Sequence, residues 1–114
     1  MKVILIEDEI NAFEYLRTIF PKTGFDIEIL EHLDSVQDSV NWLNQHPAPD
    51  LIFLDIQLAD GLSFEIFNHV EVKSPIIFTT AYDQYAIDAF KFNSIDYLLK
   101  PIHIDDLKKA SMAY

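Results

Sequence analysis

Residues 51–54 are four consecutive apolar residues that run directly into an acid, Asp55. A short apolar run of this kind, with Pro49 before it and Gly61 after it, predicts a strand that is buried on both faces of a sheet. The last residue of such a strand lies at the carboxyl edge of the sheet, where the ligand sites of open α/β sheets collect. Asp55 is therefore the first candidate functional residue.

Three other short apolar runs also end in polar side chains, at residues 2–6, 75–79 and 95–99. If all four strands are parallel and adjacent, their terminal side chains converge at one point of the sheet edge. The converging groups would be carboxylates, a hydroxyl and an ammonium group. They are Glu7 and Asp8 after the first run, Thr80 after the second and Lys100 after the third.

Segments with apolar residues at helical spacing alternate with these runs. We expect helices over residues 10–20, from Val36 until Pro47, and over 62–70, 84–92 and 103–114, a further strand over 25–33, and a loop over 56–61. Five βα units in series predict an α/β fold, a doubly wound five-stranded parallel sheet with helices on both faces. The 114 residues should form one domain, 1–114, and the chain's end inside the last helix indicates that more protein follows.

The net charge is −11, from 19 acidic and 8 basic residues. Because nucleic-acid binding depends on Lys and Arg side chains that neutralise phosphates, this segment is not expected to bind nucleic acid. No apolar run approaches the ~20 residues of a membrane helix, no signal peptide is recognisable and no cysteine is present, so we expect a cytoplasmic protein that contacts no membrane. The histidines show no ligand spacing and are expected at the surface. They are His32, His46, His69 and His103.

The carboxylates of Glu7, Asp8 and Asp55 would repel one another in a partly buried cleft, so they require a counter-charge. Oxygen ligands suit a hard cation, and Mg²⁺ takes one or two carboxylates together with water and a phosphate oxygen. A carboxylate can also attack phosphorus and become an aspartyl phosphate. Phosphoryl transfer mainly requires positioning and neutralisation of charge, which Mg²⁺, Lys100 and Thr80 are suited to supply. The spacing therefore predicts a cleft that accepts a phosphoryl group.

In their order along the chain, these motifs resemble the receiver domain of bacterial two-component response regulators, which has a flavodoxin-like fold. The resemblance covers the whole chain, and residues 55–61 and 89–101 are similar to the LytTR-type subfamily. Two positions depart from the commoner pattern, since Ala59 stands where many receivers have Pro, and Glu7 stands where Asp is more usual. The matching motifs are Glu7-Asp8, Asp55, Thr80-Ala81 and Lys100-Pro101.

The resemblance implies a role for each matching residue. Asp55 would accept the phosphoryl group from a histidine kinase or a phosphotransfer protein. Mg²⁺, or Mn²⁺ in its place, would be bound directly by Asp8, Asp55 and the backbone carbonyl of Gln57. Glu7 would act on the ion through a water, and Lys100 would pair with the phosphoryl group.

The resemblance also implies how a signal leaves the site. Thr80 would swing to bond a phosphoryl oxygen, and Tyr97 would rotate inward behind it. This would change the face formed by residues 84–92, the strand 95–99 and the last helix, which commonly forms the active homodimer in this family. The output domain is expected on the C-terminal side, as a DNA-binding domain that controls transcription.

Two other functions are compatible with the pattern. A small phosphatase with an aspartyl nucleophile could use Asp55, but such enzymes usually carry a second acid two residues later, where this chain has Gln57. An interaction module that is never phosphorylated would not need the acids together with Thr80 and Lys100. A flavin carrier would need a phosphate-binding loop, where this chain has acids at 7–9. We expect a phosphoryl acceptor with at most self-catalysed phosphotransfer and autodephosphorylation, not an enzyme.

Overall fold

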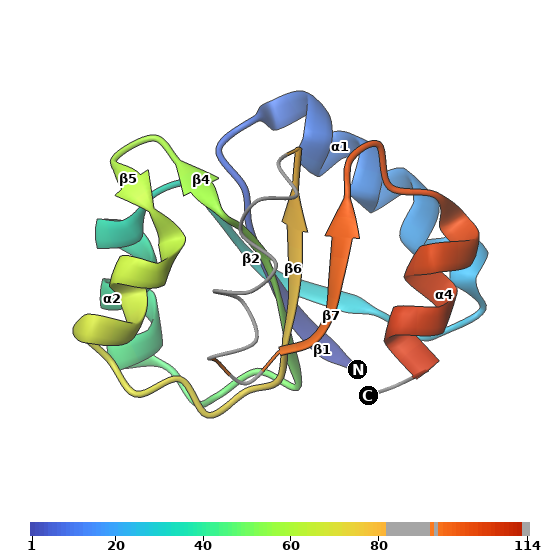
Figure 1. Ribbon diagram of the computed structural model, residues 1–114. Helices are drawn as coiled ribbons and strands as arrows, with labels where there is room; N and C mark the ends of the chain where they lie inside the picture. Colours follow the sequence, from blue (N-terminus) through green and yellow to red (C-terminus); the bar gives the residue numbers. More distant parts are fainter. Residues whose placement is uncertain (82–91, 93, 113–114) are drawn as a thin grey trace.

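Five parallel strands form one sheet in the computed structural model, which describes residues 1–81, 92 and 94–112 (Figure 1). In chain order they are β1 (Lys2–Ile6), β2 (Glu28–Leu33), β3 (Leu51–Asp55), β6 (Ile76–Thr80) and β7 (Ser94–Leu99). Their spatial order is β2-β1-β3-β6-β7, and every neighbouring pair in this sheet is parallel. The winding direction reverses between β1 and β3, which is where ligand sites form in doubly wound sheets. The predicted fold class is confirmed.

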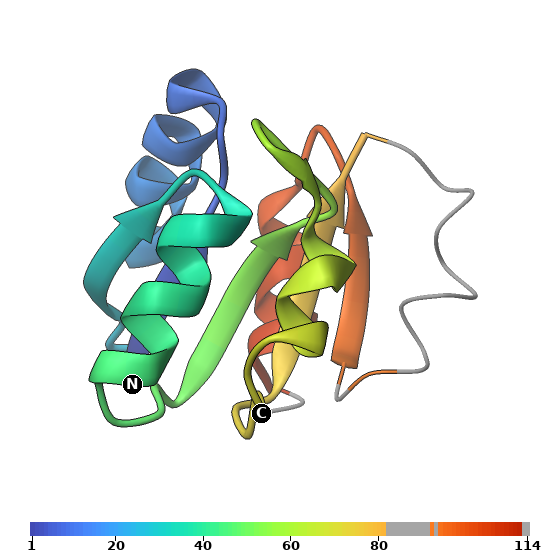
Figure 2. The same ribbon diagram turned by 90° about the vertical axis from the view of Figure 1, so that its left-hand side faces the viewer.

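Helices cover both faces of the sheet. On one face lie α1 (Ile10–Ile19) and α4 (Ile104–Met112), and on the other lie α2 (Val36–Gln45) and the 3₁₀ helix η2 (Ser63–Asn68) (Figure 1). Figure 2 shows the molecule from the side of α2 and η2, with the sheet behind them. Both faces of the central strands are thus covered, which explains why their sequences read as continuous apolar runs.

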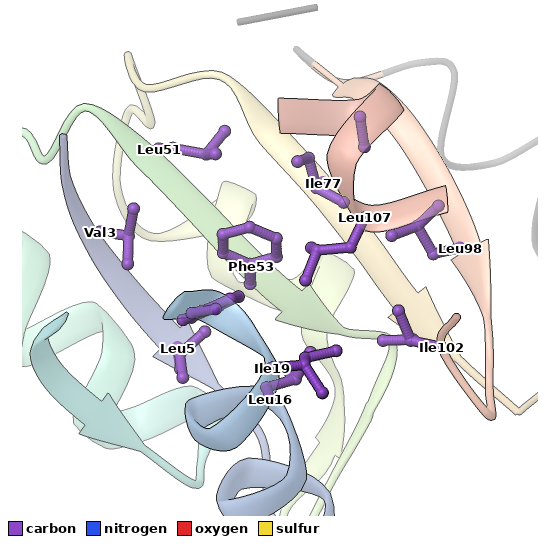
Figure 3. Close-up of a cluster of buried hydrophobic side chains, with 12 residues drawn as sticks. Val3, Leu5, Leu16, Ile19, Leu51, Phe53, Ile77, Leu98, Ile102 and Leu107 are labelled. Carbon is purple, nitrogen blue, oxygen red and sulfur yellow. The ribbon is translucent and has the colours of Figure 1, made fainter. Parts of the chain in front are cut away.

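Alternate residues of each central strand enter two separate hydrophobic clusters, because successive side chains of a strand point to opposite faces. Phe53 packs in the cluster under α1 and α4, whereas Ile52 and Leu54 pack in the cluster under α2 and η2. Figure 3 shows the first cluster, in which strand residues meet residues of the two helices. Its labelled members include Val3, Leu5, Phe53, Ile77 and Leu98 from the strands and Leu16, Ile19 and Leu107 from the helices.

The first helix ends one residue earlier than predicted, at Ile19. The chain continues into a 3₁₀ turn, η1 (Phe20–Thr23), with Pro21 in its first turn, where proline's fixed φ fits and its missing N–H is not needed. Gly24 then takes φ +83°, a left-handed conformation that glycine adopts without strain. The strand predicted over 25–33 begins only at Glu28.

The segment after β3 is more ordered than the predicted loop. Two short antiparallel strands, β4 (Gln57–Leu58) and β5 (Gly61–Leu62), form a hairpin, with Gly61 at φ +143°. The helix predicted over 62–70 is the shorter 3₁₀ helix η2, in which the His69 N–H donates to the Ile66 carbonyl three residues back. Apolar spacing indicated a helix here but could not distinguish the two helix types.

The remaining predicted elements agree to within one or two residues where the structure describes them. The helix predicted over 84–92 lies outside the described residues, except for Phe92. The peptide bond between Lys100 and Pro101 is cis. Among the described residues, no helix has both the length and the apolar character needed to cross a bilayer.

Candidate functional site

Lys100 connects the ends of two other strands at the carboxyl edge of the sheet. Its Nζ donates to Oδ2 of Asp55 over 3.1 Å and also to Oε1 of Glu7. Glu7 and Asp55 are 2% and 5% exposed, and the Lys100 side chain is 18% exposed. The predicted convergence of an ammonium group with strand-end carboxylates is therefore present, largely withdrawn from water.

Backbone hydrogen bonds between neighbouring strands position Glu7 and Lys100 at this edge. Glu7 follows β1, and its N–H donates to the Leu33 carbonyl at the end of β2 over 2.8 Å. Lys100 follows β7, and its N–H donates to the Thr80 carbonyl at the end of β6 over 2.7 Å. Because β6 lies between β7 and β3 in the sheet, the lysine side chain must span the end of β6 to reach Asp55. A shorter cation at position 100 would not reach the acids.

Three carboxylates crowd this edge. Glu7, Asp8 and Asp55 each place one oxygen so that all three oxygens lie within 4.8 Å of one another. Burial raises the pKa of Glu7, the neighbouring Asp55 carboxylate raises it further, and Lys100 opposes both effects. The pKa of Asp8, which lies at the surface, is also raised, by partial desolvation and by the charge of Glu7. Three carboxylates thus face one ammonium group, and the site lacks positive charge.

The pKa of Lys100 reflects the same excess of negative charge. Burial by itself would lower the pKa of this ammonium group, but its contacts with Glu7 and Asp55 outweigh burial and raise that pKa. Lys100 therefore stays charged, yet a single positive charge cannot neutralise the cluster. A divalent cation bound by oxygen ligands would supply the missing charge, and this donor set fits Mg²⁺.

The other predicted site residues lie on the elements beside this cluster. Thr80 is fully buried at the end of β6, next to β3, where Asp55 pairs with Thr79. Gln57 is half-buried at the start of β4, two residues after Asp55. Tyr97 is half-buried in β7, pairs with Phe78 and packs against the cluster under α2 and η2. These positions are compatible with the predicted roles, which remain predictions.

The sequence analysis did not predict the contacts of two further residues, His32 and Asp60. His32 was expected at the surface, but it is half-buried and its Nε2 lies 2.7 Å from the backbone oxygen of Glu7. The other three histidines are exposed, as predicted.

Asp60, in the hairpin turn, accepts the N–H groups of Val36 and Gln37 over 2.7 and 3.1 Å and so caps α2. Ser35 caps the same helix by accepting the N–H of Asp38. The Asp60-Gly61 pair indicated a turn in the sequence, but the contact with α2 had no local signal.

Comparisons with known proteins agree with this architecture. The family model "Response regulator receiver domain" matches residues 3–111. The chain is 43% identical over 104 residues to the sensory transduction protein LytT of Bacillus cereus, covering 89% of this chain and 42% of that protein. It is 38% identical over 111 residues to the transcriptional regulatory protein BtsR of Escherichia coli K12, covering 96% of this chain and 46% of that protein.

The solved structures show the same fold. The response regulatory domain of protein mrkE from Klebsiella pneumoniae superimposes with a TM-score of 0.83 at 31% identity, covering 98% of this chain and 93% of that one. The chain spans less than half the length of the curated relatives named above. The similarity to LytT proteins confirms the resemblance to LytTR-type regulators. The chain therefore belongs to the response regulator receiver domain family, and it is the receiver domain of a two-component response regulator.

Proposed function

We propose that Asp55 is the phosphoryl acceptor of this receiver domain and that a sensor histidine kinase or a phosphotransfer protein is the donor. The observation that carries the proposal is the double contact of Lys100 with Glu7 and Asp55, at the carboxyl edge of the sheet where the winding direction reverses. An ammonium group held against one carboxylate oxygen of Asp55 is placed to stabilise negative charge that arrives on that side chain. Asp55 is 5% exposed, so an incoming group would meet a carboxylate with few competing waters.

In the transfer step, one carboxylate oxygen of Asp55 forms a bond to phosphorus while the bond from phosphorus to the donor's imidazole nitrogen breaks. The electron pair of the broken bond stays on the imidazole, which takes up a proton. Asp8, Asp55 and the carbonyl of Gln57 would hold Mg²⁺ or Mn²⁺, with Glu7 acting through a water. The chemistry that a bound ion supplies is neutralisation of the phosphoryl oxygens. Lys100 would then pair with the phosphoryl group.

The proposal extends to how the domain signals. Thr80 would bond a phosphoryl oxygen, since its strand β6 pairs with β3 and ends beside Asp55. Tyr97 would rotate inward behind it, from β7 on the other side of β6. The face that includes β7 and α4 would then favour a homodimer. The relatives named LytT and BtsR are described as sensory transduction and transcriptional regulatory proteins. We propose a DNA-binding output domain in the longer protein, which would act in the cytoplasm.

Beryllofluoride, a mimic of the phosphoryl group, tests the acceptor. The chain should take up one BeF₃⁻ in the presence of Mg²⁺ and none in EDTA, measured by ¹⁹F NMR. Asp55→Asn should abolish this uptake, because the amide offers no anionic oxygen. Uptake by Asp55→Asn equal to that of the wild type would remove Asp55 from the acceptor role.

The same preparation distinguishes the phosphatase alternative. A phosphoryl acceptor should hydrolyse a small phosphate ester no faster than the aspartyl phosphate itself decays. Turnover of many equivalents by the wild type, lost in Asp55→Asn, would instead favour a phosphatase. Gln57, two residues after Asp55, stands where such a phosphatase usually carries its second acid.

A further inference from the structure

His32 holds the backbone of the acidic segment that follows β1. Its Nε2 lies 2.7 Å from the backbone oxygen of Glu7. Because a carbonyl oxygen can only accept, Nε2 carries a proton and donates it in this bond. The imidazole ring also stacks on Phe13 of α1, with 3.8 Å between the ring centroids and an angle of 3° between the ring planes. One half-buried side chain on β2 therefore contacts both the acidic segment and the helix that follows it.

The peptide groups on both sides of Glu7 are consequently fixed by β2. On one side the Glu7 N–H donates to Leu33, and on the other the Glu7 carbonyl accepts from His32. β1 ends at Ile6, so this carbonyl lies beyond the hydrogen-bond ladder between β1 and β2. The Glu7 carbonyl and the Asp8 N–H belong to one planar peptide group. A donor that holds the carbonyl therefore also sets the direction in which Asp8 leaves the sheet.

The carboxylates create a need for such a tether. Glu7, Asp8 and Asp55 have oxygens within 4.8 Å of one another, and their mutual repulsion favours movement of the first two away from the third. Asp55 belongs to the central strand β3, whereas residues 7–9 follow the end of β1, so the repulsion acts mainly on the position of residues 7–9. A hydrogen bond from β2 to the Glu7 carbonyl opposes that movement.

We propose that His32 is a positioning residue for the divalent-cation site. Its Nε2–H keeps the Glu7–Asp8 peptide where both carboxylates can act on an ion together with Asp55. This inference rests on the proposed function, because it assigns His32 a role towards the cation that the phosphoryl acceptor requires. Residues that orient metal ligands typically change metal affinity by about 10–100-fold when they are lost.

Three substitutions separate the hydrogen bond from the ring stack. His32→Phe keeps a flat ring against Phe13 but removes the donor. His32→Gln removes the ring but places an amide N–H at a similar reach, and His32→Met has nearly the same length as Gln without a donor. His46→Phe is a matched control, because His46 also stacks on an aromatic ring, Trp42, and also contacts a backbone carbonyl, away from the acids.

The Mg²⁺ dissociation constant of the chain is measured by calorimetric titration, alongside thermal unfolding in EDTA. We expect His32→Phe and His32→Met to weaken Mg²⁺ binding about tenfold. His32→Gln should stay within about threefold of the wild type, and His46→Phe should not change the affinity. Should His32→Phe fail to fold, the comparison of His32→Met with His32→Gln still isolates the effect of the hydrogen-bond donor.

Wild-type Mg²⁺ affinity in His32→Phe or His32→Met would overturn the inference. An equal loss of Mg²⁺ affinity in His32→Gln and His32→Met would also overturn it. If the wild type binds Mg²⁺ and Asp55→Asn does not, either of these results would leave the proposed function standing. Absence of Mg²⁺ binding by the wild type would overturn the proposed function and this inference together.

Discussion

Replacing Asp55 with Asn should make the metal-free domain more stable, although it destroys the proposed acceptor. The substitution changes a carboxylate that is 5% exposed into an amide of nearly the same shape. It therefore leaves the packing of β3 unchanged and alters mainly the charge of the cluster. Natural side chains at functional sites often cost stability in this way.

The magnitude follows from the distances. With an effective dielectric constant of about 20, the attraction lost between Asp55 and Lys100 at 3.1 Å is about 5 kcal/mol. The repulsion removed between Asp55 and Glu7, whose nearest ligand oxygens lie within 4.8 Å, is at least about 3.5 kcal/mol. Asp8 is exposed, so its repulsion is screened to about 1 kcal/mol. Attraction and repulsion thus nearly cancel.

The decisive quantity is then the cost of burying the charged carboxylate, which amounts to several kcal/mol for a fully buried ion. Asn avoids most of this cost. We expect Asp55→Asn to raise the free energy of unfolding in EDTA at pH 7.5 by about 1–3 kcal/mol, which corresponds to roughly 4 °C in Tm for each kcal/mol.

Urea unfolding, followed by the fluorescence of the single tryptophan, Trp42, measures the difference. Asp26→Asn is the control, because it removes one exposed carboxylate before β2, at the opposite edge of the sheet, and should change stability by less than about 0.5 kcal/mol. Saturating Mg²⁺ should stabilise the wild type and have little effect on Asp55→Asn. A variant that is equally or less stable than the wild type in EDTA would refute the reasoning.

The pH dependence provides an independent check with a defined sign. The pKa of Glu7 is raised in the folded state, first by burial and then by Asp55. The folded protein consequently binds more protons than the unfolded chain between the unfolded and the folded pKa of Glu7, and its stability decreases as pH rises through that range. Acidification from pH 7.5 should therefore raise the free energy of unfolding of the wild type more than that of Asp55→Asn, because protonation of Glu7 removes its repulsion with Asp55. The stability gap between the two proteins should narrow, and a gap that widens on acidification would contradict the assigned repulsion.

The remaining predictions concern Lys100 and Asp60. Lys100→Ala should stay folded but lose about 3 kcal/mol of unfolding free energy in EDTA, the low end for a broken buried ion pair, since its ammonium is partly exposed. At saturating BeF₃⁻ this variant should remain monomeric in size-exclusion chromatography while the wild type dimerises; an unchanged dimer response would remove Lys100 from signalling. Asp60→Ala should cost about 1 kcal/mol in urea unfolding, because Val36 and Gln37 lose their capping acceptor. The pKa of Asp60 is lowered by these bonds, so its stabilisation is lost as pH falls through the folded pKa, and a cost that persists in strong acid would exclude capping by the carboxylate.

The sequence predicted most of the fold because its signals are local. Each apolar run with a polar terminator indicates both a buried strand and the edge at which that strand ends, and alternation with helices leaves only the parallel arrangement. The contact of Lys100 with Asp55 follows from that arrangement. His32 could not be predicted in the same way, because its contact depends on the register that pairs Ile6 with Leu33. A lone histidine in a partly alternating strand carries no local signal of such a neighbour.

The charge balance of the site gives a physical reason for coupling between the acceptor and the face that we propose as the switch. A phosphoryl group on Asp55 would add negative charge to a cluster that already lacks positive charge, so Lys100 would follow the new oxygens. The Lys100 N–H is bonded to the Thr80 carbonyl, and β6 and β7 pair directly up to that point. A displacement of Lys100 would therefore act on the ends of the two strands that carry Thr80 and Tyr97. If Asp55 lay deeper in the sheet, or if the cation came from a flexible loop, the same charge change would be absorbed locally and would not reach that face.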